Sequence, residues 1–362
     1  MKITPKKISI EISTLCNLSC EMCFLAGFRR KEITGAKEDA FFSLDLFKGL
    51  VDEISEKFPV FQNTSFFSFN FTGGETFLHP KILEMLEYAR GKNIGVTVFT
   101  NGTLIDLAVA ADIVKAKPAA LMFSIDGPRE IHDQIRGQGN FEKACQAINL
   151  IQSQKRLFNA REPRIYINTL INNLTVDHLE DMIFIGDALK IDGLFFSHIQ
   201  WSTPESSALV QNEFKERLGW SAPLSRMVEA MEHNLSVGAD QLDRLLVQVD
   251  LIKNTHRNRN SFFVNFLPDL SLEEIALWYS PDIYKIDFCT APAEWLRIGV
   301  NGDVQPVCAL APFPFGNLNE KFFQKIIDSR EAKKFFDEIE ANGFFYACQR
   351  CCRRPARSRS LC

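Results

Sequence analysis

The sequence predicts an α/β fold: a partial (β/α)6 TIM-like barrel, then a helical bridge and a small cysteine-rich α+β domain. Six apolar, β-rich runs alternate with amphipathic stretches over about the first 200 residues, the alternation then stops, and six of the ten cysteines lie from Cys289 onward. Alternating strands and helices require a parallel sheet with right-handed crossovers. We therefore expect a barrel at residues 1–200, a helical bridge at 201–286 and a cysteine-rich domain at 287–362.

Hydrophobic periodicity marks the elements of the barrel. Runs of β-forming residues predict six strands, at 8–12, 66–71, 95–99, 121–125, 165–170 and 194–198. Apolar residues spaced three and four positions apart predict helices at 44–58, 81–92, 106–116, 141–155 and 176–189. In such a barrel the functional residues are expected at the C-terminal ends of the strands.

The composition is that of a folded, enzyme-sized protein. The 362 residues are 46% hydrophobic and 24% charged, which excludes a disordered chain. Lys and Arg total 41 against 45 Asp and Glu, so the basic field of a nucleic-acid-binding protein is missing. No apolar run reaches the roughly 18–20 residues of a membrane span, and no signal peptide opens the sequence. We expect a cytoplasmic protein with neither nucleic acid nor a membrane as partner.

Polar residues follow four of the predicted strands. The second strand is followed by Gly73, Gly74 and Glu75, the third by Asn101, the fourth by Ser124 and Asp126, and Asn168 lies at the end of the fifth. Each of these groups alone is equally compatible with an ordinary strand-to-helix turn. Together they converge on one rim of the barrel, and the first strand brings a cysteine triplet to the same rim.

The triplet consists of Cys16, Cys20 and Cys23, spaced C-x3-C-x2-C. Three thiolates do not complete a tetrahedral zinc site, but they can bind three corners of a cubane [4Fe–4S] cluster and leave one iron open. The alternatives are a zinc site with a remote fourth ligand and unliganded thiols. An open iron can be chelated by a small molecule, which then accepts an electron from the cluster.

With this triplet the sequence resembles the radical S-adenosylmethionine (radical SAM) enzymes. The resemblance continues through Gly73-Gly74-Glu75 and residues 100–102, 124–128 and 132–137, and one departure is Met22, where the family usually has an aromatic residue. It implies that SAM binds the open iron and is cleaved reductively to methionine and a 5′-deoxyadenosyl radical. The electron would come from a partner such as flavodoxin or ferredoxin.

The resemblance also implies roles for the rim residues. The backbone of Gly73 and Gly74 and the Glu75 carboxylate would receive the amino group of SAM, and Arg136 would pair with its carboxylate. Such a pair is physically reasonable because a guanidinium is a planar, always charged partner for a carboxylate. The remaining SAM-contacting residues would be Asn101, Ser124, Asp126 and Asn168.

The C-terminal segment predicts a second cysteine site. Residues 295–300 and 303–307 flank Asn301-Gly302, a signal for a type I′ hairpin turn, and a helix near 318–341 follows. The hairpin and helix would bring together four thiolates, those of Cys289, Cys308, Cys348 and Cys351. The segment resembles Twitch, the shortened SPASM domain of radical SAM enzymes, which implies one auxiliary [4Fe–4S] cluster. Structural zinc remains an alternative, and Cys352 could replace Cys351 as the fourth ligand.

Contacts to a small-molecule substrate are predicted from the end of the sixth strand. His198, Gln200 and Trp201 point towards the barrel opening, with a local hydrogen bond for His198 and core packing for Trp201 as alternatives. Cys352 and Cys145 are either simple packing residues or catalytic donors of a hydrogen atom to a substrate radical. The bridge contains a capping box at Ser271 and Glu274.

Four functions are consistent with these features. The first is oxidation of a small polar substrate such as a sugar or aminocyclitol, and the second is epimerisation of a similar substrate, which needs a thiol. The third is maturation of a ribosomally made peptide, against which we note that only 15 residues precede Cys16. The fourth, a non-enzymatic electron-transfer or zinc-scaffold protein, leaves the glycine- and acid-containing rim unexplained.

Overall fold

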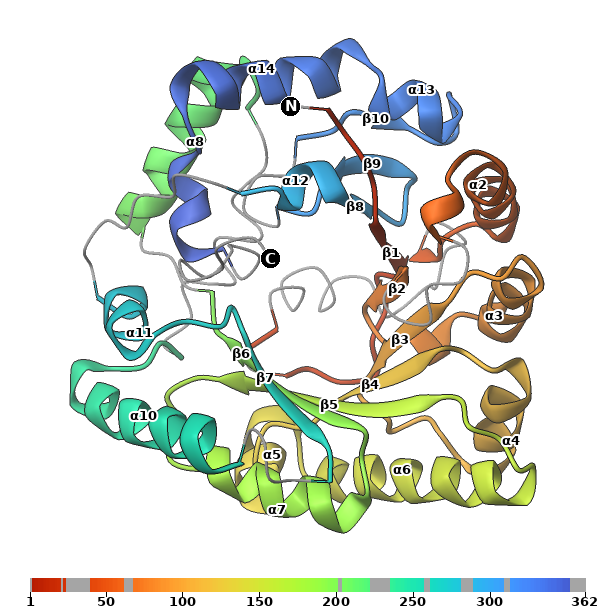
Figure 1. Ribbon diagram of the computed structural model, residues 1–362, viewed down its shortest axis with the longest axis vertical. Coiled ribbons are helices and arrows are strands. Elements are labelled where there is room, and N and C mark those ends of the chain that lie inside the picture. The colour runs from red at the N-terminus through yellow and green to blue at the C-terminus, as the bar shows by residue number, and fades with distance from the viewer. Residues whose placement is uncertain are drawn as a thin grey trace.

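The computed structural model describes residues 2–20, 22–23, 40–61, 68–200, 204–221, 235–256, 261–280, 289–308 and 313–351. Its centre is one ten-stranded sheet, which curves around the middle of the molecule (Figure 1). The strands are β1 (Lys7–Ser13), β2 (Phe69–Gly73), β3 (Val96–Thr100), β4 (Ala120–Ser124), β5 (Arg164–Ile171), β6 (Gly193–His198), β7 (Phe263–Leu267), β8 (Trp295–Ile298), β9 (Asp303–Pro306) and β10 (Gly316–Asn317).

The strand order β10-β9-β8-β1-β2-β3-β4-β5-β6-β7 confirms the predicted partial barrel, because β8 and β1 to β7 are all parallel neighbours. The six predicted strands are present. A seventh, β7, lies in the segment predicted to be a helical bridge and pairs with β6. The predicted C-terminal hairpin also joins this sheet, since β8 pairs with β1. The boundaries of the three domains remain predictions.

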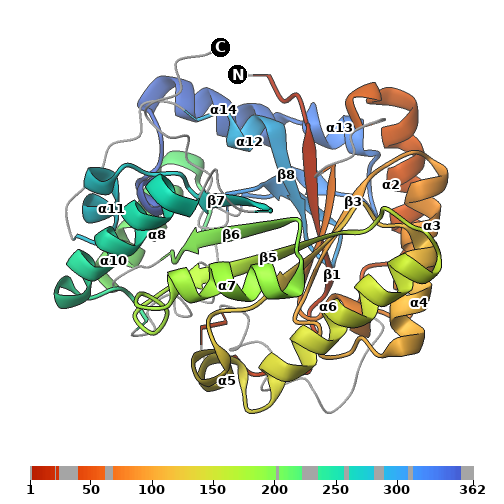
Figure 2. The same ribbon diagram turned by 60° about the horizontal axis from the view of Figure 1, so that its bottom comes forward.

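Helices cover the outer side of the sheet (Figure 2). The α-helices are α2 (Leu44–Lys57), α3 (Ile82–Gly91), α4 (Leu107–Ala116), α5 (Arg129–Arg136), α6 (Asn140–Leu157), α7 (Leu179–Leu189), α8 (Pro204–Leu218), α10 (Ala239–Leu251), α11 (Leu272–Trp278), α12 (Ala291–Glu294), α13 (Phe323–Ile327) and α14 (Arg330–Asn342). Short turns of other helix types are η2 (Pro59–Phe61), η3 (Thr76–Leu78), η4 (Ile252–His256) and η5 (Tyr346–Arg350). Within the described ranges, every helix is too short or too polar to cross a membrane.

The main core lies between the sheet and the outer helices. Alternate strand residues such as Ile8, Ile10 and Phe71 are fully buried there, as the two-residue period of a strand requires. Phe47 of α2 packs edge-on against Phe69 and Phe71 of β2, with ring centroids 6.3 and 5.4 Å apart. Full burial of each such ring contributes roughly 1.5–3 kcal/mol, so these contacts fix the helices on the sheet.

The intervening strand residues face the inside of the curved sheet, which has two unlike halves. On β4 to β6, Met122, Tyr166 and Phe195 form a separate apolar cluster. On β8 and β1, Arg297 forms an ion pair with Glu11, while Trp295 Nε1 donates a hydrogen bond to Ser9 Oγ over 2.8 Å. The interior therefore presents aromatic groups on one side and charged or polar groups on the other.

The hairpin between β8 and β9 forms as predicted, but its turn type is different. Gly299 N donates to Asp303 O and Gly302 N donates to Gly299 O, both at 2.9 Å, and only Gly302 has a positive φ, of 88°. A type I′ turn needs two positive φ values, so this is a three-residue loop that ends in a left-handed glycine. The carbonyl oxygen of Asn301 accepts hydrogen bonds from the side chains of Asn317 and Asn319, and these tertiary contacts explain the difference.

The single helix predicted near 318–341 is two helices. Ser329 begins α14, where its Oγ accepts a hydrogen bond from Ala332 N over 3.1 Å and donates one to Phe315 O over 2.9 Å. The capping box of α11 is confirmed, because Ser271 N donates to the Glu274 side chain and Glu274 N to Ser271 Oγ.

Removing the Glu53 carboxylate should destabilise the junction between α2 and α13. This buried side chain accepts hydrogen bonds from the backbone N of Phe323 and Gln324, at 2.7 and 3.0 Å. We expect Glu53→Ala to lower the free energy of unfolding by about 1–3 kcal/mol, because buried donors lose their acceptor. Urea denaturation measures this, with Glu56→Ala, an exposed residue of the same helix, as the control that should change little. Equal effects of both substitutions would contradict the interpretation.

Candidate functional site

The loop that carries Cys16, Cys20 and Cys23, here called the cysteine loop, begins where Gly73 and Gly74 contact the backbone at the end of β1. Gly74 N donates a hydrogen bond to Ser13 O over 2.6 Å, and Glu75 N donates one to Leu15 O over 2.7 Å. A Cβ at Gly74 would lie 1.7 Å from Leu15 O, and one at Gly73, whose φ is 112°, would lie 2.4 Å from Ser13 O. Only glycine fits these positions, and their contact sets where the loop that carries Cys16 leaves the sheet.

Glu75 connects this contact to the next strand. Its side chain is 1% exposed, and its carboxylate accepts hydrogen bonds from Thr100 Oγ1 (2.7 Å), Asn101 N (2.8 Å) and Phe77 N (3.2 Å). Burial raises the pKa of Glu75, and these hydrogen bonds lower it in part. Because both oxygens are bound within the protein, the geometry makes Glu75 a residue that positions the ends of β2 and β3.

Asn101 continues the connection to the first cysteine. Its Nδ2 donates to Cys16 Sγ (3.8 Å) and to Asn17 Oδ1 (3.0 Å). Its Oδ1 accepts from the N and Oγ1 of Thr103, which fixes the amide so that the NH2 group faces the sulfur. The sequence pattern selected Asn101 but gave no sign of its contact with Cys16.

Arg136 at the end of α5 reaches the second cysteine. Its Nη1 donates to Cys20 Sγ over 3.9 Å, and its Nε donates to Asp126 Oδ2 over 2.5 Å. Asp126 is fully buried, and its Oδ1 accepts from Leu170 N over 2.8 Å. Burial raises the pKa of the Cys20 thiol, and the positive charge of Arg136 partly opposes that shift. Burial lowers the pKa of His132 to about 4, so its neutral ring can accept a hydrogen bond from Asp126 N.

Two further contacts at this rim were missed by sequence reasoning. Asn168, in register with Ser124 on the neighbouring strand, accepts a 2.6 Å hydrogen bond from Ser197 Oγ of β6. Asn172 is fully buried, and its Nδ2 donates to Met22 Sδ over 3.8 Å. Strand alternation could have identified Ser197 as facing inward, whereas no local signal links Asn172 to the cysteine loop.

Other predicted site residues lie elsewhere. His198 is buried on the outer side of β6, where it shares a 3.1 Å hydrogen bond with the Tyr279 hydroxyl and contacts the ring of Trp278. Gln200 is half-buried, and Trp201 and Cys352 lie outside the described residues. Their contacts with substrate remain predictions. Cys145 packs against the main core from α6, apart from the cysteine triplet, and burial raises its pKa to about 11.

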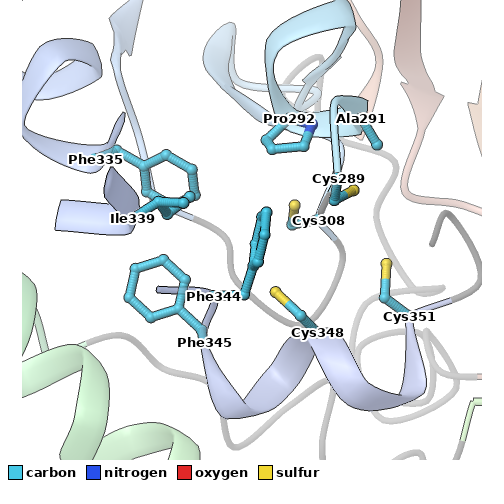
Figure 3. Close-up of a pocket in the computed structure, with 10 residues that line it drawn as sticks. All are labelled: Cys289, Ala291, Pro292, Cys308, Phe335, Ile339, Phe344, Phe345, Cys348 and Cys351. Atoms are coloured by element: carbon cyan, nitrogen blue, oxygen red, sulfur yellow. The ribbon is translucent and has the colours of Figure 1, made fainter. Parts of the chain in front are cut away.

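Four of the six cysteines from Cys289 onward line one pocket (Figure 3). Cys289 precedes α12, Cys308 follows β9, and Cys348 and Cys351 come from η5 and the residue after it. The rest of the lining is apolar: Ala291, Pro292, Phe335, Ile339, Phe344 and Phe345. Cys351 faces this pocket, whereas Cys352, the other predicted fourth ligand, lies outside the described residues.

The donor set of this pocket fits an iron–sulfur cluster. Burial raises the pKa of Cys289, and it raises that of Cys348 to about 12, so these thiolates need a cationic partner in their apolar surroundings. Within the described part of the chain, no three His, Cys, Asp or Glu side chains lie close enough to chelate a single ion. A cluster makes a different demand, because each thiolate binds its own iron.

A half-buried arginine anchors the segment that leads to Cys348. Arg217 of α8 donates to Glu213 Oε1 (2.7 Å), Glu338 Oε1 (2.8 Å) and Gly343 O (2.6 Å). Its guanidinium also lies 4.2 Å from the ring centroid of Phe345. These contacts hold the start of η5 between α8 and α14.

Comparison with known proteins agrees with this arrangement. The family model of the radical SAM superfamily matches residues 10–184, and that of the SPASM iron–sulfur cluster-binding domain matches residues 289–352. Mycofactocin maturase MftC of Mycolicibacterium smegmatis is 28% identical over 195 residues, which are 52% of this chain and 45% of that protein. The serine-type anaerobic sulfatase-maturating enzyme of Bacteroides thetaiotaomicron is 30% identical over 159 residues, 41% and 37% of the two chains. The chain therefore matches less than half the length of these curated relatives.

The fold is also that of solved structures. The structure of anSMEcpe with bound AdoMet superposes with a TM-score of 0.63 at 20% identity, covering 98% of this chain and 92% of that one. A radical SAM domain binds SAM and a [4Fe–4S] cluster, and a SPASM domain indicates auxiliary iron–sulfur binding, so the predicted cofactors are confirmed. The chain therefore carries a radical SAM domain at residues 10–184 and a SPASM-type iron–sulfur cluster-binding domain at residues 289–352.

Proposed function

We propose that this protein is a radical SAM maturase, which modifies a peptide or protein by removing a hydrogen atom from one of its carbons. The similarity to mycofactocin maturase and to a sulfatase-maturating enzyme supports this choice of substrate class. The same comparisons favour it over the sugar or aminocyclitol substrate that we expected first. Its relatives also include a heme synthase and an Fe-coproporphyrin III synthase, so a tetrapyrrole is the second candidate.

The observation that carries the radical chemistry is the convergence of two strand ends and one helix end on the cysteine loop. Glu75, Asn101 and Arg136 link β2, β3 and α5 to the residues around Cys16 and Cys20. When bound there, SAM and the [4Fe–4S] cluster supply a 5′-deoxyadenosyl radical as the hydrogen-abstracting agent. We assign Cys16, Cys20 and Cys23 as the ligands of this cluster.

The hydrogen bonds of the rim refine the predicted SAM contacts. The amino group of SAM donates hydrogen bonds, so we assign the carbonyl groups of Gly73 and Gly74 as its acceptors, while the N–H groups of Gly74 and Glu75 are bound to Ser13 and Leu15. Asp126 positions Arg136, whose guanidinium is assigned to the SAM carboxylate. Ser124 and Asn168, adjacent in register, are assigned to the ribose side.

At the second site we assign Cys289, Cys308, Cys348 and Cys351 as ligands of an auxiliary cluster. A cluster held there would supply an electron acceptor for an oxidative modification. The apolar lining excludes water from the thiolates, and the Arg217 anchor keeps Cys348 in place. We further propose a small reducing protein such as flavodoxin or ferredoxin as the source of electrons.

Cysteine substitutions should separate the two sites. In anaerobically reconstituted protein, Cys20→Ala should abolish 5′-deoxyadenosine formation. Cys348→Ala should remove the auxiliary iron, while cleavage of SAM at the first site remains measurable. Each change should remove about four iron atoms, since a cubane needs its thiolates. Iron and zinc analysis with chromatography of deoxyadenosine provides the measurement. Cleavage of SAM by Cys20→Ala would contradict the assignment of Cys20 as a cluster ligand. One zinc ion per protein, in place of the auxiliary iron, would show that the second site is a structural zinc site.

Substrate class can be tested by product formation. With SAM and dithionite, short peptides encoded beside the gene should increase deoxyadenosine formation and change in mass by mass spectrometry. Aminocyclitols and coproporphyrin serve as the competing substrates, and Cys20→Ala is the control for background modification. A product found only with an aminocyclitol or only with a porphyrin would reject the maturase proposal and select the corresponding class.

Cys145 should not donate a hydrogen atom to the substrate. Its side chain lies on α6 and packs against the main core between the sheet and the outer helices, not on the inside of the curved sheet. In deuterated solvent, Cys145→Ala should therefore leave product yield and deuterium content unchanged. The matched variant Cys352→Ala tests the other predicted thiol. Loss of solvent deuterium from the product in Cys145→Ala alone would overturn the expectation.

A further inference from the structure

Two polar side chains from outside the cysteine loop reach the sulfurs of the first site. Asn101 Nδ2 lies 3.8 Å from Cys16 Sγ, and Arg136 Nη1 lies 3.9 Å from Cys20 Sγ. The first comes from the end of β3 and the second from α5, so separate parts of the barrel supply the two donors.

Both donors are held in place by other bonds. The Asn101 amide is oriented by two hydrogen bonds to its Oδ1 from Thr103. Arg136 is oriented by Asp126, whose second oxygen is bound to Leu170 N and whose side chain is fully buried. Such preorganised groups do not need to reorient when the charge on a neighbouring sulfur changes.

These two contacts affect how easily a cluster bound by the three cysteines is reduced. A [4Fe–4S] cluster gains one negative charge when it is reduced, and hydrogen bonds to its sulfurs and nearby positive charge stabilise that state. Arg136 and Asp126 together are close to neutral, so the net field at Cys20 depends on both members of the pair. In a buried site such a field is weakly screened.

We propose that Asn101 and Arg136 set the reduction potential of the cluster bound by the triplet, and that Asp126 moderates the charge of Arg136. This inference rests on the proposed function, because it requires a cluster at Cys16, Cys20 and Cys23. It makes the three residues tuning groups for electron transfer, in addition to any contact that they make with SAM.

Opposite shifts in two variants distinguish this role from a structural one. Arg136→Gln leaves the negative charge of Asp126 beside the cluster and should make the potential more negative than in the unsubstituted protein. Asp126→Asn leaves the positive charge of Arg136 and should make it less negative. Asn101→Ala removes one hydrogen bond and should shift the potential in the same direction as Arg136→Gln, by less.

The potential is measured by an EPR-monitored redox titration without SAM. All variants are made in a Cys289→Ala/Cys348→Ala background, so that the auxiliary cluster does not contribute to the signal. Arg129→Gln is the matched control, because Arg129 lies on the same helix but is exposed and paired with Glu142, and it should not shift the potential. Arg136→Lys, which keeps the charge, should restore most of the original value.

The outcomes separate this inference from the proposed function. Shifts of the same sign in Arg136→Gln and Asp126→Asn, or no shift in either, would overturn the tuning role while the cluster assignment stands. If Arg136→Gln fails to retain iron, Asp126→Asn and Arg136→Lys still decide, since the inference requires a less negative value in the first and a near-original value in the second. Absence of any [4Fe–4S] signal in the background protein would instead reject the proposed function.

Discussion

The close backbone contact between Gly73-Gly74 and residues 13–15 is the constraint on which the site depends. It places β2 so near the exit of β1 that no side chain fits between them, and thereby fixes the direction of the cysteine loop. Glu75 transmits that position to β3 through its hydrogen bonds with Thr100 and Asn101. Hydrogen bonds within the protein thus fix the ends of β1, β2 and β3 relative to one another. Because the start of the cysteine loop is already oriented by these strand ends, ligand binding there costs little conformational entropy.

At both cysteine sites burial makes deprotonation of the thiols unfavourable, although the surroundings of the two sites differ. Burial raises the pKa of Cys20 and of Cys348, so at either site the ligand-competent thiolate is disfavoured until a cation binds. At the first site Arg136 already offsets part of this penalty. The second has an apolar lining, and its anchoring comes instead from the Arg217 contacts with α14 and the start of η5.

The periodicity of apolar residues was sufficient to predict the helices and strands whose apolar faces can be identified from neighbouring residues in the sequence. The six strands and most outer helices follow from apolar spacing, and the cysteine spacing anticipated the pocket lined by Cys289, Cys308, Cys348 and Cys351. It was not sufficient where long-range pairing decides. The run that forms β7 is five residues long and becomes a strand through its ladder with β6, and β8 joins β1 from almost 290 residues away. By contrast, strand alternation alone is enough to place His198 on the outer side of β6, because Ser197 takes the inward position.

The pairing of β8 with β1 also fixes how the two cysteine sites are related. Lys7 lies opposite Trp295 at the start of both parallel strands, near Cys289, whereas β1 ends at Ser13 just before Cys16. A strand of this length spans roughly 20 Å, so the two sites lie near opposite ends of one rigid ladder. Along that ladder the interior presents the Glu11–Arg297 pair and Trp295, and across from it the aromatic cluster around Tyr166.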